Sequence, residues 1–161
     1  MTVEYRVGQG WDLHRLVAMR PLVLGGVSIP YEKGLDGHSD ADVLTHAIID
    51  ALLGAIADGD IGTHFPETDP AWRGASSLDI LELALRRVQA ARWYVVNVDT
   101  TVIAERPKIG PHRDAICETL ARAIGIDVVA VSVKAKTAEG LGAEGRGEAI
   151  SAQAVVLLAR G

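Results

Sequence analysis

Apolar residues recur at intervals of three and four in three stretches of the chain, and this spacing predicts helices. The first helix is expected over 43–56 and the second over 77–91. The third is expected to open at Pro111, because proline is favoured at the first position of a helix, and to close at Gly125. The polar segment 59–75 between the first two helices is long for a compact domain, which is typical of a functional loop.

Other stretches alternate between apolar and polar residues, or are continuously apolar, and these predict strands. Residues 94–104 alternate clearly, whereas 149–159 carry apolar side chains on both faces. A strand of the second kind is expected to be covered on both sides, here by other subunits. The predicted strands are 3–9, 22–30 with a turn at Gly25-Gly26, 94–104, 128–136 and 149–159.

Together these elements predict an α/β chain of the α+β type, in which a mixed sheet carries its helices on one face. With 48% apolar and 23% charged residues, the whole chain 1–161 is expected to form a single domain with its own core. Cys117 is the only cysteine and no signal peptide is evident, so we expect a cytoplasmic protein. The net charge of −5 argues against nucleic-acid binding, although a metal ion or a few lysines and arginines could still hold a small anion.

Histidines and carboxylates gather in two short stretches, "GWDLHRL" and "GHSDADVLTHA". Asp12 and His14 stand two residues apart in extended chain, so both side chains point the same way. His46 falls in the second turn of the 43–56 helix, for which we predict Ser39 as the N-cap. If the strand and the helix meet, the three side chains form a divalent metal site with an open position, as in catalytic zinc sites.

Spacing alone leaves other interpretations of these residues open. His46 also fits a hydrogen-bonded core histidine, and Asp12 fits a turn residue. Asp42 and Asp50 lie four residues on either side of His46, so one of them could orient its imidazole. Capping of the helix explains Asp42 equally well, and a solvated face explains Asp50. The metal site is therefore a hypothesis that depends on the tertiary contact.

Two glycine-containing stretches near the end of the chain bear on ligand binding. "GLGAEG" at 140–145 matches the dinucleotide fingerprint, but a strand follows it instead of a helix, so we reject that function. "VKAKTAEGLG" places Lys134, Lys136, Thr137 and Glu139 at the end of a predicted strand. This set suits phosphate with Mg²⁺ or Mn²⁺, and it also fits a solvated strand end.

Five stretches taken in order closely resemble 2-C-methyl-D-erythritol 2,4-cyclodiphosphate synthases: "GQGWDLHRL", "LGGVSIPYEKGLDGHSDADVLTHAIIDALLGA", "GDIGTHFPETDP", "NVDTTVIAERPKIGPH" and "VKAKTAEGLGAEGRGEAISAQAVVLL". The resemblance runs from Tyr5 to Leu158, and the D-x-H and G-H-S-D-x-D-x-x-x-H motifs are highly specific. It implies a cyclising phosphorus–oxygen lyase of the non-mevalonate isoprenoid pathway. The implied enzyme is a homotrimer with active sites between subunits. Its reaction would be metal-assisted intramolecular phosphoryl transfer, which turns 4-diphosphocytidyl-2-C-methyl-D-erythritol 2-phosphate into 2-C-methyl-D-erythritol 2,4-cyclodiphosphate and CMP.

The resemblance also implies a role for each matching residue. Asp12, His14 and His46 would hold one Zn²⁺ per site, and Glu139 would hold a Mg²⁺ or Mn²⁺ that bridges the substrate diphosphate. His38 and Thr137 would be the catalytic residues that steady the transferring phosphoryl group. The substrate-binding residues would be Ser39 near the phosphates; Asp60 at the cytidine ribose, with Ile61 and Gly62; Phe65 and Asp69 at the methylerythritol end; Ala104, Pro107 and Lys108 at the cytosine; and Lys136 and Arg146.

Some positions depart from the pattern of that family or qualify what it implies. Lys136 stands where many members have threonine and could add a cation near the diphosphate, so we expect activity to be retained. Ala143 replaces a larger, often aromatic residue, which puts contacts at the trimer centre in doubt. Arg146 is retained and could face an internal channel that binds an isoprenoid diphosphate in some members, although Gln153 weakens this idea.

Two other functions are compatible with the residues alone. Two histidines and one carboxylate also form the facial triad of non-haem Fe(II) oxygenases, although those ligands usually sit in β-barrels and this chain predicts three helices. The chain could instead be a non-catalytic, metal-stabilised nucleotide-binding trimer, although a structural zinc site normally closes its fourth position with a protein ligand. The resemblance favours the synthase.

Overall fold

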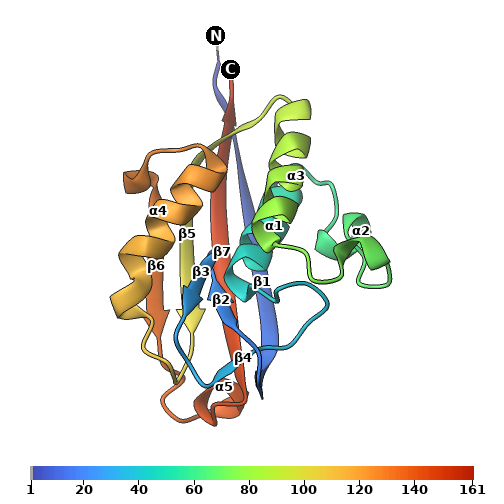
Figure 1. Cartoon of the computed structure of the whole chain (residues 1–161). Coiled ribbons are helices and arrows are strands. Elements are labelled where there is room, and N and C mark those ends of the chain that lie inside the picture. The colour runs from blue at the N-terminus through green and yellow to red at the C-terminus, as the bar shows by residue number, and fades with distance from the viewer. Residues whose placement is uncertain (1) are drawn as a thin grey trace.

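A five-stranded sheet with helices over one of its faces forms the protein, as the computed structural model of residues 2–161 shows (Figure 1). The strands are β1 (Glu4–Ala18), β2 (Leu22–Leu24), β3 (Val27–Ile29), β4 (Lys33–Leu35), β5 (Tyr94–Ile103), β6 (Val131–Lys136) and β7 (Ala149–Arg160). The helices are α1 (Val43–Ala55), α2 (Ile61–His64), α3 (Ser77–Ala90), α4 (Arg113–Ile124) and α5 (Gly142–Gly145), with 3₁₀ turns η1 (Pro70–Trp72), η2 (Gly110–His112) and η3 (Val128–Ala130).

The sheet has the strand order β4-β1-β7-β5-β6, and β2 and β3 form a separate hairpin. Only β5 and β6 run parallel, and the other neighbours in the sheet are antiparallel, which confirms the predicted mixed sheet. The helices α1, α3 and α4 lie on the same side of it (Figure 1). No helix in residues 2–161 is both long enough and apolar enough to cross a bilayer.

The three long helices appear close to where the apolar spacing predicts them, but two of their starts differ. Pro111 lies in η2, and α4 begins two residues later. Ser39 is not the N-cap of α1. Asp42 has that place, because its carboxylate accepts a hydrogen bond from the Thr45 N–H at 3.0 Å. The same carboxylate accepts the N–H groups of the Gly25-Gly26 turn at 2.9 and 2.7 Å, so it joins α1 to the β2–β3 hairpin.

The strands differ from prediction mainly in length. β1 continues well beyond residue 9, since its backbone pairs with β7 from Glu4 to Arg15 whatever the polarity of its side chains. β6 begins at Val131, because the three preceding residues form η3, which is capped by Asp127. The segment 59–75, expected as an irregular loop, contains α2 and η1.

Two glycines in β1 allow α1 to lie directly on the strand. A Cβ atom at Gly8 would lie 1.8 Å from the carbonyl oxygen of Ala51, and one at Gly10 would lie 1.9 Å from that of Ala47. Only glycine leaves room for such a close approach of two backbones. The helix residue beside Ala47 is His46, so this packing brings its imidazole down onto the strand.

The opposite face of the sheet is open in a single chain. Along β7, the side chains that face the helices are buried, whereas Val155 on the other face is 44% exposed. On the neighbouring strand β1, Tyr5, Val7 and Trp11 are 62%, 67% and 53% exposed. Large apolar side chains therefore cover a sheet face that nothing within the described chain shields.

Candidate active site

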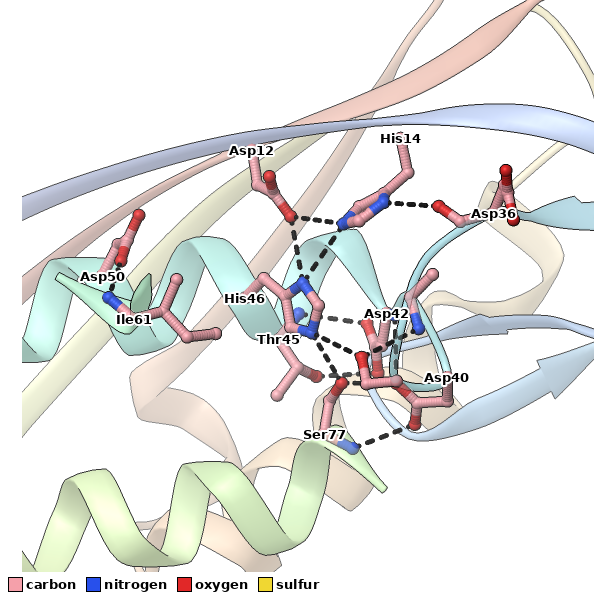
Figure 2. A network of polar contacts seen from close by, with 12 residues as sticks. Asp12, His14, Asp36, Asp40, Asp42, Thr45, His46, Asp50, Ile61 and Ser77 are labelled. Atoms are coloured by element: carbon pink, nitrogen blue, oxygen red, sulfur yellow. Dashed lines mark hydrogen bonds and ion pairs between the residues drawn. The ribbon is translucent and has the colours of Figure 1, made fainter. Parts of the chain in front are cut away.

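Three side chains that can bind a metal ion converge where α1 lies over β1 (Figure 2). Asp12 Oδ2 lies 3.0 Å from His14 Nε2 and 3.1 Å from His46 Nδ1, and the two nitrogens are 3.3 Å apart. Within residues 2–161, no other group of three or more His, Cys, Asp or Glu side chains has its ligand atoms this close together. The structure thus confirms that the predicted strand and helix residues meet.

The charges in this cluster favour a cation between the three groups. Burial lowers the pKa of His14, but the Asp12 carboxylate outweighs it, so the pKa is raised above 6.5. Burial likewise raises the pKa of Asp12, but hydrogen bonds and charge from His14 and His46 lower it to about 2. His14 Nδ1–H donates to the Asp36 carbonyl at 2.7 Å, which aims Nε2 at Asp12. A proton or a metal ion can satisfy the cluster, and its two imidazoles and one carboxylate suit zinc.

The cluster opens into a cavity of about 570 Å³. His38 stands at its wall, where its Nε2–H donates to the Asp69 carbonyl at 3.2 Å. Glu67 and Thr68, which lie within the predicted substrate-binding stretch "FPETD", line the same cavity, and so does Trp72, which the sequence motifs did not single out. The predicted site residues that line it are Asp12, His14, His38, Ser39, His46, Ile61, Gly62 and Phe65.

The short helix α2 forms one wall of the cavity and is tied to α1. Asp50 on α1 accepts a hydrogen bond from the Ile61 N–H at 2.8 Å. Burial raises the pKa of Asp50. Asp60 caps α2, since it accepts the N–H and the hydroxyl of Thr63 at 2.9 and 2.8 Å, and its exposed carboxylate does not line the cavity. In the described chain, therefore, Asp60 has a structural partner in addition to any ligand.

Five of the other predicted site residues lie at the far edge of the sheet. Ala104, Pro107, Lys108, Lys136 and Thr137 line a separate cavity of about 460 Å³ at the end of β6. This edge is joined by two hydrogen bonds: the Ala104 N–H donates to the Lys136 carbonyl at 2.9 Å, and the Ala138 N–H donates to Glu105 at 3.1 Å. Most of the predicted site residues of a single chain therefore form two separate groups, which we call its two half-sites.

Three charged residues on β6 or in the segment after it are exposed, and two of them form ion pairs. Lys134 is paired with Asp99 on the surface, with its Nζ 2.8 and 2.7 Å from the carboxylate oxygens. Arg146 pairs with Glu148 at 2.9 Å. Glu139 is exposed, with the Thr137 hydroxyl 3.5 Å from its carboxylate.

Neither Asp42 nor Asp50 contacts the His46 imidazole, so of the two interpretations left open for Asp42 the structure confirms helix capping. The Asp42 carboxylate accepts hydrogen bonds from the first turn of α1 and from the Gly25-Gly26 turn of the hairpin. The Asp50 carboxylate accepts one from the first residue of α2. The partner of His46 Nε2 is Ser77, at 2.8 Å, and the sequence indicated this residue only as the start of a helix. Tertiary packing of α3 against α1 brings the two side chains together, and no local pattern encodes that contact.

The model of the YgbB family matches residues 5–159. The chain belongs to the YgbB family. A curated relative from Bordetella petrii, named 2-C-methyl-D-erythritol 2,4-cyclodiphosphate synthase, is 59% identical over 160 residues, which cover 99% of each chain. The matched region spans the residues of both half-sites.

Solved structures share this fold. One is a 2C-methyl-D-erythritol-2,4-cyclodiphosphate synthase in a CDP-bound form, with a TM-score of 0.88 and 42% identity over 95% of this chain and 99% of that one. Another is the bifunctional IspDF from Campylobacter jejuni, with a TM-score of 0.96 and 37% identity. The match to IspDF covers 99% of this chain but only 43% of the bifunctional protein.

Proposed function

We propose that the protein converts 4-diphosphocytidyl-2-C-methyl-D-erythritol 2-phosphate into 2-C-methyl-D-erythritol 2,4-cyclodiphosphate and CMP. An oxygen of the 2-phosphate attacks the β-phosphorus and forms the new P–O bond, while the bond from that phosphorus to the CMP phosphate breaks. The observation that carries the proposal is the cluster of Asp12, His14 and His46 at the mouth of a cavity, in a chain of this family. The named relatives favour this function over an Fe(II) oxygenase or a non-catalytic binding trimer.

Asp12, His14 and His46 would hold a Zn²⁺ ion through the three atoms that already face one another. Bound there, the ion would act as a Lewis acid that draws charge from the reacting phosphates. The protein supplies three ligands and leaves a position open, which fits a catalytic site better than a closed structural one.

The remaining residues position the substrate. His38 projects from the loop before α1 into the cavity, where its imidazole can bind a phosphate oxygen. Ile61, Gly62 and Phe65 form the wall opposite, against which the methylerythritol carbons would pack. Two anionic phosphates must be brought in line against their mutual repulsion, so most of the catalysis is positioning and charge neutralisation.

The far edge would bind the nucleotide and a second cation. Lys108 and the backbone around Pro107 would form the cytosine pocket, and Lys136 and Thr137 would face the phosphates from the same cavity. We place the Glu139 carboxylate there as the protein ligand of that cation. Magnesium is commonly held by one or two carboxylates together with substrate phosphates, so the residue fits a Mg²⁺ or Mn²⁺ ion bound with the substrate.

A homotrimer would bring the two half-sites together. In one chain, Asp12 on β1 and Thr137 after β6 are separated by strands β7 and β5. The exposed apolar face that carries Tyr5, Val7 and Trp11 offers a surface for neighbouring copies. We expect adjacent subunits to place the β6 end of one beside the metal cluster of the next. We also expect Arg146 to face the trimer axis, where an isoprenoid diphosphate is a candidate ligand, and the enzyme to act in the cytoplasm.

The proposed reaction is tested by ³¹P NMR of the purified protein with the diphosphocytidyl substrate, Zn²⁺ and Mg²⁺. The expected result is a cyclic diphosphate that appears together with an equimolar amount of CMP. Release of CMP with only linear products would show a hydrolase, and a folded, zinc-loaded protein without turnover would contradict the synthase.

A mixing experiment tests the shared site. His46→Ala and Glu139→Gln variants are each expected to be inactive. If each site takes His46 from one subunit and Glu139 from its neighbour, random trimers from a 1:1 mixture should recover about a quarter of the wild-type activity. If both residues belong to the same chain in the working site, the mixture stays inactive. Native mass spectrometry of the same samples, with one variant labelled with nitrogen-15, checks that subunits have exchanged.

A further inference from the structure

Both ring nitrogens of His46 have partners. Nδ1 faces the metal cluster, and Nε2, on the other side of the ring, faces a series of hydrogen-bonded polar side chains (Figure 2). Its Nε2 lies 2.8 Å from the Oγ of Ser77, the first residue of α3. Ser77 Oγ in turn makes a very short contact with the Asp40 carboxylate. Ser77 is fully buried and His46 is 9% exposed, so bulk water does not compete for the bond between them.

The direction of each hydrogen bond follows from the groups involved. An Asp40 carboxylate can only accept, so the Ser77 hydroxyl gives its single hydrogen to Asp40. The Ser77 oxygen then has only lone pairs left for His46, and it accepts the Nε2–H. A neutral imidazole carries one hydrogen, so His46 Nδ1 presents its lone pair toward Asp12 and His14. The chain of bonds therefore selects the tautomer that a metal ion requires.

Asp40 is itself fixed in place. Its Oδ2 accepts the N–H of Ser77 at 3.0 Å, and its Oδ1 accepts the N–H of Asp42 at 3.1 Å. The carboxylate thus joins the start of α3 to the loop that leads into α1. The bonds that hold Asp40 leave it little freedom to release the Ser77 hydroxyl.

A second hydroxyl near His46 is compatible with the same arrangement. Ser39 Oγ lies farther from Nε2, at 3.3 Å, and accepts the Ala41 N–H. It can share the Nε2–H as a weaker acceptor, so it does not require the other tautomer.

We propose that Ser77 and Asp40 are positioning residues that set the metal affinity of the site through His46. The proposal rests on the metal cluster of the proposed function, but it concerns binding of the ion and not turnover. Groups that accept the free N–H of a metal-binding histidine typically change metal affinity or activity by about 10- to 100-fold.

The first test compares Ser77→Ala with Ser76→Ala. Ser76 precedes it and is exposed, and its side chain makes no capping hydrogen bond, so it is a matched control. Competition with a chromophoric chelator should show that Ser77→Ala weakens Zn²⁺ binding by about 10- to 100-fold. Ser76→Ala should bind as the wild type does. A Ser77→Ala protein that unfolds at the wild-type temperature and binds Zn²⁺ within twofold of the wild type would overturn the proposal.

Asp40→Asn tests the direction of the bonds with little change of shape. The amide has one acceptor oxygen in place of two, so it cannot accept the same three hydrogens. With its NH₂ toward Ser77, the hydroxyl would turn to donate to His46 and favour a hydrogen on Nδ1, which blocks the metal. The expected result is weaker Zn²⁺ binding and a changed visible spectrum of the Co²⁺-loaded protein.

A measurement on the wild type stands even if the variants misfold. Nitrogen-15 NMR of the metal-free protein at alkaline pH should show the hydrogen of His46 on Nε2, and finding it on Nδ1 would contradict the proposal. The two failures are distinguishable. An inactive protein whose variants still differ in Zn²⁺ affinity contradicts only the synthase, whereas an active enzyme whose Ser77→Ala variant binds Zn²⁺ normally contradicts only the role of Ser77.

Discussion

The two half-sites occupy the ends of one row across the sheet, and they differ in how complete they are. Asp12 pairs with Ala152, which pairs with Val102, which pairs with Ala135. At about 4.8 Å per strand, the ends of this row are roughly 14 Å apart. The metal half, which carries Asp12, His14 and His46, is packed between strand and helix, and its three side chains that can bind a metal ion are in contact. The other half, which we call the nucleotide half after its proposed role, lies on the exposed edge at the end of β6.

A metal site and a site for a large ligand have different structural requirements. Metal ligands must be fixed to within a few tenths of an ångström, and the packed interface between α1 and β1 provides that rigidity in one chain. The proposed ligand of the nucleotide half is large and flexible, and Lys108, Lys136 and Glu139 there are all exposed. The edge needs a second surface to complete it, and a neighbouring subunit would supply one.

Substitutions of the proposed metal ligands in the two half-sites should both lower turnover strongly, but only one of them should lower the zinc content. His46→Ala removes a ligand and should lower turnover about 1000-fold or more while purified protein loses its zinc. Glu139→Gln should also lower turnover, but the purified protein should keep zinc at one ion per chain. Metal analysis and steady-state kinetics on both variants check this. Equal zinc loss in both would contradict the division into two half-sites.

A substitution in β1 can disturb the close packing of α1 on β1 that positions the metal cluster. Gly10→Ala places a methyl group against the Ala47 carbonyl and should destabilise the fold by about 3 kcal/mol, with loss of Zn²⁺ binding. Gly54→Ala is the control, since its methyl group meets only the Gln9 carbonyl at 3.9 Å and alanine favours a helix by about 1 kcal/mol. Urea unfolding measures both. A Gly10→Ala protein as stable as the wild type would show that α1 can shift freely.

Two variants of Asp60 can show whether its carboxylate contacts the ribose or only caps α2. Asp60→Ala should raise KM for the substrate about tenfold with little change in kcat, because the ribose is remote from the reacting phosphorus. Asp60→Ser keeps a side-chain cap for α2 but removes the carboxylate. If the ribose contact matters, both variants show the raised KM. If the cap alone matters, the serine variant restores the wild-type value.

The smallest expected effect concerns the charge pair beside the nucleotide half. Lys134→Met should change the free energy of unfolding by at most about 1 kcal/mol, since the pair with Asp99 is largely exposed. The Lys134 ammonium outweighs a small effect of burial and holds the pKa of Asp99 below 3.8. The pair therefore contributes its stability above pH 3.8 and loses it as the pH falls through the lowered pKa. Unfolding curves of wild type and variant should converge in acid, and a turnover loss in the variant would instead place Lys134 in the site.

Local patterns in the amino-acid sequence were enough to predict the main helices and strands and the three residues of the metal cluster. Apolar spacing predicted three long helices, alternation predicted the strands, and D-x-H with G-H-S-D-x-D-x-x-x-H pointed to Asp12, His14 and His46. These patterns are local, because a helix or a strand presents its side chains with a fixed period. A local pattern is also enough to place a histidine in the second turn of a helix.

Only the tertiary structure decided what these residues touch. The sequence left open whether Asp42 caps the helix or orients His46, and in the structure Asp42 caps α1 and binds the Gly25-Gly26 turn. The partner of His46 is Ser77, 31 residues away on another helix. The separation of the two half-sites is decided by strand order, which sets the pairing of distant segments and leaves no periodic trace in the sequence.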